Sequence, residues 1–190
     1  MHPLIMPLLG VLFYFSKTPR FIPEPIIQAK VFSTVLLTVL LPILVYYLLK
    51  TLNKVETIYL KSTHERKLPL LINSFIISLV ITRVFTFNEI QELYYFFIGV
   101  LLSTLICLIL AVFKIKASIH MLAASGFFMF ALGLSIHFKI NINGTIALMT
   151  ILLGAIATSR LHLKAHTYPE LFIGSLTGCI PQLTLLYFWL

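Results

Sequence analysis

The sequence contains no aspartate, and its acidic residues are six glutamates in a chain of 190 residues. Charged residues of both signs make up only 11% of the chain, whereas 59% of the residues are hydrophobic. A soluble domain typically has about 45–50% apolar residues and about 25% charged residues. Because the apolar residues form long uninterrupted runs, the mean hydropathy of +1.02 indicates a membrane protein.

Cysteine is also scarce, and no polar region is long enough for a separate soluble domain. Cys107 and Cys179 both fall inside apolar runs, so we expect them to be small core residues. The formal charge of +8 comes from basic residues in short loops. This placement favours anionic lipid or phosphate as the partner and argues against nucleic acid.

The apolar runs predict an all-α, polytopic membrane helical bundle. Residues 3–15 fall short of the about 20 residues that a spanning helix needs, so we expect a short, half-inserted or tilted helix. Residues 1–25 comprise this segment and a proline-rich connector, and residues 26–190 are expected to form a six-helix membrane domain. The expected helices, with a kink at Pro42 and a break at Pro181, are 26–49, 68–87, 93–113, 119–136, 143–158 and 171–190.

Counting the crossings places three polar loops on one membrane face, here called side A. They are residues 50–67, 114–118 and 159–170. Side A carries nine lysines and arginines and the opposite face, side B, carries five. Polar residues must lie in loops, but this does not explain why His64, His120, His162 and His166 all fall on side A. The asymmetry predicts a functional site there.

The stretch from Ser159 to Glu170 concentrates two histidines, two cations and one carboxylate in twelve residues. The guanidinium of Arg160 can bind two phosphate oxygens at once. Glu170 follows His166 by four residues, and a carboxylate on one imidazole nitrogen fixes the tautomer of a nucleophilic histidine.

Other roles for the same residues stay open. Thr167-x-x-Glu170 is also a capping box that would begin the last helix. His162-x-x-x-His166 has the spacing of two metal ligands, although no aspartate or cysteine nearby would complete a site. Arg160 and Lys164 are also suited to anchoring at anionic head groups.

The run Ser159-Arg160-x5-His166-x3-Glu170 resembles the third motif of the type 2 phosphatidic acid phosphatase family, Ser-Arg-x5-His-x3-Asp. Glutamate stands here in place of the aspartate.

Two further stretches resemble the other motifs of that family. Ala117-Ser118-Ile119-His120 keeps the serine and histidine of the second motif, Pro-Ser-Gly-His. The first motif is Lys-x6-Arg-Pro, which Lys61 and Pro69 match in spacing. Leu68 replaces its arginine, and Arg66 or Lys67 could supply the missing cation.

The resemblance implies a six-helix core over residues 26–190 and an integral membrane lipid phosphate phosphatase. Such an enzyme hydrolyses a phosphorylated or pyrophosphorylated lipid through a phosphohistidine, without a metal or cofactor. The implied catalytic residues are His166 as nucleophile, His120 as proton donor to the leaving alkoxide and Glu170 as the partner of His166. The implied phosphate-binding residues are Arg160, Ser118, Lys61, Arg66, Lys67 and Ser159.

Two other hypotheses remain. The departures at Leu68, Ile119 and Glu170 motivate a non-enzymatic relative that binds lipid or acts as a membrane scaffold. A transporter of an anionic solute would use the side-A cations, but the sequence shows no paired broken helices in corresponding halves.

The expected partners are the lipid substrate and membrane lipids. The excess of basic residues on side A would place that face in the cytoplasm, whereas the family's sites face away from it. We expect a bacterial inner membrane, with the site facing away from the cytoplasm.

Overall fold

The structure is a computed structural model that describes residues 2–55 and 62–190. Lys61, an expected phosphate-binding residue, lies outside these ranges. Every regular element in the described residues is helical, as expected for an all-α chain. The elements are η1 (Pro3–Ile5), α1 (Met6–Lys17), α2 (Glu24–Val35), the π-helical η2 (Leu36–Leu40), α3 (Leu41–Thr51), α4 (Thr63–Arg83), α5 (Gln91–Val112), α6 (Ile119–His137), α7 (Asn143–His162) and α8 (Tyr168–Leu186).

Four helical stretches in the described part of the chain are long and apolar enough to cross a membrane. They are Glu24–Thr51, Gln91–Val112, Ile119–His137 and Asn143–His162. Helices α4 and α8 occupy the other two positions expected for spanning helices. The all-helical class is therefore confirmed in the described residues. Since four of the six expected helices meet the length and apolarity criterion, a six-helix membrane core stays a prediction.

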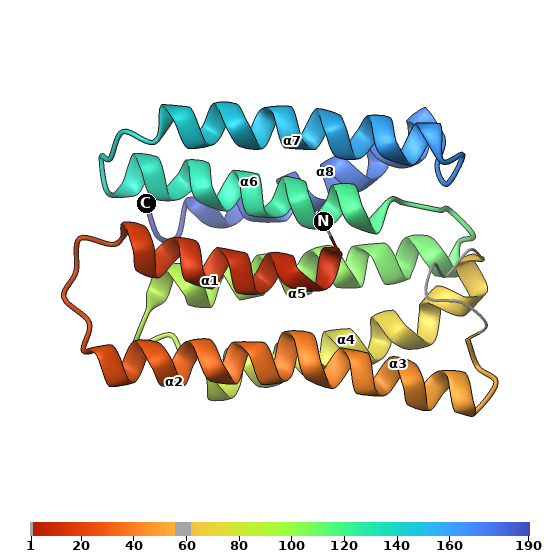
Figure 1. Cartoon of the computed structure of the whole chain (residues 1–190), viewed down its shortest axis with the longest axis horizontal. Helices are drawn as coiled ribbons and strands as arrows, with labels where there is room; N and C mark the ends of the chain where they lie inside the picture. The colour runs from red at the N-terminus through yellow and green to blue at the C-terminus, as the bar shows by residue number, and fades with distance from the viewer. Residues whose placement is uncertain (1, 56–61) are drawn as a thin grey trace.

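The helices lie roughly along one long axis, and α1 lies between α6 and α2 (Figure 1). Helix α6 packs closely on α8 because glycines remove the intervening side chains. A Cβ atom on Gly178 would lie 2.1 Å from the Leu122 carbonyl oxygen. Helix α7 packs along α6 at the edge of the bundle and buries no residue completely.

The prolines affect their helices differently from one another. Before Pro42 the helix widens into η2, where the Leu41 N–H donates to the Leu36 carbonyl. The expected break at Pro181 was wrong, because α8 continues through it to Leu186. Tertiary contacts hold the helix together there: Gln182 Nε2 donates to the Phe96 carbonyl of α5 at 2.9 Å.

At the side-B end, a buried carboxylate joins α1, α5, α6 and the connector after α1. The Glu92 side chain is 1% exposed and forms an ion pair with Arg20 at 2.6 Å. The Tyr14 hydroxyl donates to Glu92 Oε2 at 3.3 Å, and His137 Nε2 lies 3.1 Å from Oε1. These contacts fix the first helix in the bundle, and sequence reasoning did not identify them because the partners are far apart in the chain.

We predict that Glu92→Gln lowers the free energy of unfolding by about 2 kcal/mol or more, because Arg20 and His137 lose a buried charged partner. The matched control is Glu89→Gln, which removes a 51%-exposed carboxylate paired with Lys30. An exposed pair contributes at most about 1 kcal/mol. Thermal denaturation in detergent compares the two variants, and equal shifts would contradict a stabilising role for the Glu92 contacts.

Candidate functional site

Two sharp helix-to-helix turns at side A build the site. Lys114, two residues after the end of α5, is in the left-handed region (φ 62), and Lys164, two residues after the end of α7, has the same conformation (φ 49). In each turn a later N–H closes the helix end, as when Ala165 N–H donates to the Arg160 carbonyl at 3.1 Å. His166 therefore lies in the short turn between α7 and α8.

His166 and Glu170 form a direct pair. His166 Nδ1 lies 2.7 Å from Glu170 Oε2, and the imidazole is 7% exposed. The same oxygen accepts the Thr167 N–H at 3.3 Å, and Thr167 and Glu170 form a complete capping box. The two roles considered for Glu170 are thus both present, because one carboxylate oxygen reaches both groups.

Burial and neighbouring charges set the ionisation of His166. Burial lowers the pKa of His166 below its usual value, and the positive charges of Lys116 and Arg66 lower it further. The hydrogen bond with Glu170 and the charge of that carboxylate raise the pKa of His166, but the net shift is downward. This downward shift favours the neutral imidazole, which is the form a nucleophile requires.

The turn between α5 and α6 lies directly against this pair. Ser118 N–H donates to the Glu170 carbonyl at 3.0 Å. Lys116 Nζ donates to the Ala165 carbonyl at 2.9 Å and lies 3.8 Å from Glu170 Oε2. Lys116 was not identified from the sequence. Its position two residues before Ser118 could have indicated that it lies near the site.

This close approach depends on a glycine in α8. A Cβ atom on Gly174 would lie 2.5 Å from the Ser118 carbonyl oxygen. Because the obstructing atom belongs to the backbone, any side chain at position 174 would push α8 away from the turn between α5 and α6.

Arg66 and Lys67 lie in a helix and not in the loop that the sequence suggested. Helix α4 begins at Thr63, so Arg66 and Lys67 are in its first turns. The Arg66 side chain is buried and its Nη1 donates to the Ala117 carbonyl at 2.7 Å. Arg66 thus lies next to Ser118, whereas Lys67 is half-buried and Leu68 is 39% exposed.

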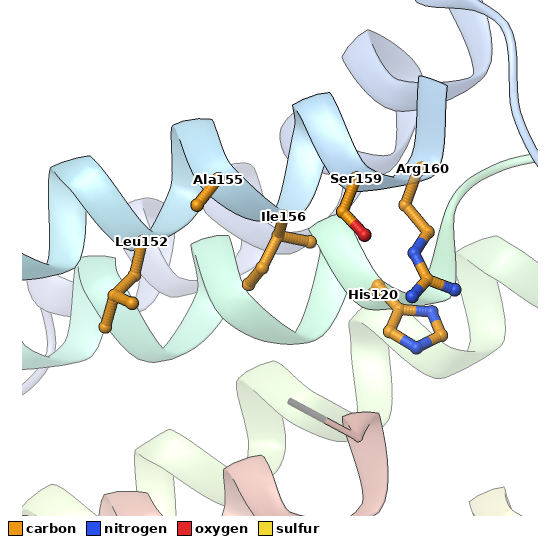
Figure 2. Close-up of a pocket in the computed structure, with 6 residues that line it drawn as sticks. All are labelled: His120, Leu152, Ala155, Ile156, Ser159 and Arg160. Atoms are coloured by element: carbon orange, nitrogen blue, oxygen red, sulfur yellow. The ribbon is translucent and has the colours of Figure 1, made fainter. Parts of the chain in front are cut away.

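A pocket of about 180 Å³ lies between the start of α6 and the end of α7. His120, Ser159 and Arg160 form its polar end, where the ring of His120 and the guanidinium of Arg160 face each other (Figure 2). Its apolar wall consists of Leu152, Ala155 and Ile156.

Two buried polar groups near this pocket have no hydrogen-bond partner in the described part of the chain. They are Arg160 Nε and Ser118 Oγ. An unpaired buried donor is costly, so a ligand that accepts a hydrogen bond from Arg160 would be stabilised. Ser118 is completely buried and is not one of the residues that line the pocket.

The structure therefore brings the expected residues into two adjoining groups. His120, Ser159 and Arg160 line the pocket, while His166 and Glu170 pair beside Lys116. His120 lies within electrostatic range of both Arg160 and His166, which connects the groups. His162, the other histidine of the possible metal spacing, is exposed, and no three potential metal-ligating side chains gather in residues 2–55 and 62–190.

His2 also reaches the site and was not identified from the sequence. Its ring packs edge-on against that of His120, with 6.2 Å between centroids.

Comparisons with protein-family models, curated proteins and solved structures find no match for this chain. The fold defines a class only: an all-helical protein with several helices able to cross a membrane. The site adds a buried histidine that is paired with a carboxylate and lies among cations.

The family resemblance predicts phosphate-ester turnover, and we expect Glu170→Gln to reduce it strongly while leaving thermal stability nearly unchanged. Glutamine can still accept the Thr167 N–H, but it removes the charge that stabilises a His166 imidazolium. The pKa of His166 should therefore fall further in this variant, and the acid limb of the pH–rate profile should move to lower pH. Histidine NMR titration and initial rates measure both effects.

The matched control is Thr167→Ala, which removes the capping side chain without touching His166. It should lower the free energy of unfolding by about 1 kcal/mol and preserve turnover. Retained activity with lost stability in Glu170→Gln would show that Glu170 serves only the helix cap.

Proposed function

We propose that the protein is an integral membrane lipid phosphate phosphatase that works through a phosphohistidine. The observation that carries this proposal is the buried His166–Glu170 pair, with 2.7 Å between Nδ1 and Oε2. Glu170 holds the proton on Nδ1, which leaves Nε2 of a neutral imidazole free to attack phosphorus.

The cations around His166 match the charge of a phosphate ester. The charge of a transferring phosphoryl group is spread over its three equatorial oxygens, and fixed cations stabilise that charge without reorganising. Arg160 lines the pocket with an unpaired Nε, and Lys116 and Arg66 are close enough to act on His166.

The reaction has two displacements. His166 Nε2 forms a bond to phosphorus as the bond to the ester oxygen breaks, and the leaving alkoxide takes a proton from His120. Water then attacks the phosphohistidine, with His120 accepting its proton, and releases phosphate. A bound phosphate dianion between Arg160 and His120 favours the protonated imidazole that the first step needs.

The substrate in this proposal is a phosphorylated or pyrophosphorylated lipid in a bacterial inner membrane, with the site facing away from the cytoplasm. Helices α4 and α8 would span alongside the four more apolar stretches, completing a six-helix core. Because these two helices carry the polar residues that support the site, such as Arg66 and Glu170, their lower apolarity accords with the proposal.

One observation favours a second candidate, a relative that binds lipid phosphate without turnover. Ser118, which would donate to the phosphate, is completely buried. Its hydroxyl reaches a ligand only if the turn between α5 and α6 moves.

Phosphate release from lipid phosphates in detergent tests the proposal. We predict that wild-type protein releases phosphate in the presence of EDTA and that His166→Ala lowers the rate at least about 10³-fold, the scale of losing a nucleophile. A lipid-binding protein would bind the same lipids and release no phosphate.

His120→Ala should slow cleavage of an alkyl lipid phosphate much more than cleavage of an aryl phosphate, because an aryl oxide leaves without protonation. General acid catalysis contributes about 10²–10⁴-fold. Equal losses on both substrates would exclude His120 as the proton donor, and loss of activity with EDTA that Zn²⁺ or Mg²⁺ restores would refute the metal-independent mechanism.

A further inference from the structure

A second cavity, of about 100 Å³, lies deeper in the bundle than the pocket with Arg160. Five side-by-side residues of α6 form one wall: Ile119, Leu122, Ala123, Gly126 and Phe127. They recur at the spacing of one helix face. Since a helix rises 1.5 Å per residue, this wall extends about 12 Å into the bundle from the residue next to His120.

The first residues of the chain also line this cavity. They are Pro3, Leu4, Met6 and Pro7, and His2, just before them, packs on His120. Figure 1 shows that α1 begins about midway along the bundle and runs toward the side-B loops. Ile119 lines this cavity and the next residue, His120, lines the pocket with Arg160, so the two adjoin at the start of α6.

The cavity lining is mostly apolar, and three of its polar side chains form hydrogen bonds within the protein. Thr38 and Thr104 donate to carbonyls of their own helices at 2.8 Å. Gln182 Nε2 donates to the Phe96 carbonyl. Asn73 and Ser103 also line the cavity, and its remaining lining residues are apolar. A mostly apolar lining favours hydrocarbon over water, as in an engineered apolar cavity of about 150 Å³ that stays dry and binds benzene.

We propose that this cavity binds the part of a lipid's hydrocarbon chain that adjoins the phosphate ester. This inference rests on the proposed function and identifies the substrate class as a lipid with an unbranched carbon chain next to its phosphate. Leu4 and Met6 then act as specificity-determining residues, because they limit the width of the chain that fits against α6.

Photocrosslinking of the full chain in detergent tests this placement without depending on turnover. The probes are two alkyl phosphates, one with a diazirine three carbons from the phosphate and one with it at the far end of a long chain. The first probe should label η1 and the cavity face of α6, and peptide mass spectrometry locates the label. Labelling of outward-facing residues such as Leu148 or Ile151 by both probes would overturn the proposal.

A matched pair of variants measures the contribution of the cavity. Ala123→Phe fills it, whereas Ala147→Phe adds the same side chain to an exposed position of α7. Excluding two methylene groups from an apolar site weakens binding about tenfold. Ala123→Phe should weaken the first probe's labelling about tenfold and Ala147→Phe should not, and equal effects would overturn the proposal.

The outcomes separate this inference from the proposed function. Cavity labelling without phosphate release supports the chain site and refutes the phosphatase. Phosphate release with labelling only on the outer faces of α7 or α3 supports the phosphatase and refutes the chain site.

Discussion

The side-A architecture depends on the contacts that Glu170 makes. In a chain without aspartate, this one side chain pairs with His166, caps α8 through Thr167 and approaches Lys116. Its backbone carbonyl accepts the Ser118 N–H from the neighbouring turn. One residue therefore joins two turns that are far apart in sequence. At the other end of the bundle, Glu92 similarly joins α1, α5 and α6.

Much of the fold could be predicted because long apolar runs and polar turns record the helices directly in the sequence. The pairing of His166 with Glu170 was also predictable, since their spacing of four residues covers about one helical turn. What the spacing could not show is that His166 lies outside α8. The pair forms nonetheless, because the capping box fixes Glu170 at N3, close to the residue that precedes the cap.

Other features depend on contacts between distant segments, which local patterns do not encode. Arg66 was considered as a substitute cation in a loop, and the structure places it in α4, bonded to the Ala117 carbonyl. The contact of His2 with His120 requires the first helix to enter the bundle, which no spacing predicts. Pro181 was expected to break its helix, and packing on α5 overrides that local preference.

Direct detection of a phosphorylated histidine tests the central claim most sharply. Rapid quenching of the protein with a radiolabelled lipid phosphate, followed by peptide mapping, reveals any covalent intermediate. The account predicts an acid-labile, base-stable phosphoryl group on His166 that disappears in His166→Ala. Release of phosphate with the label on another residue, or with His166→Ala still forming the intermediate, would contradict it.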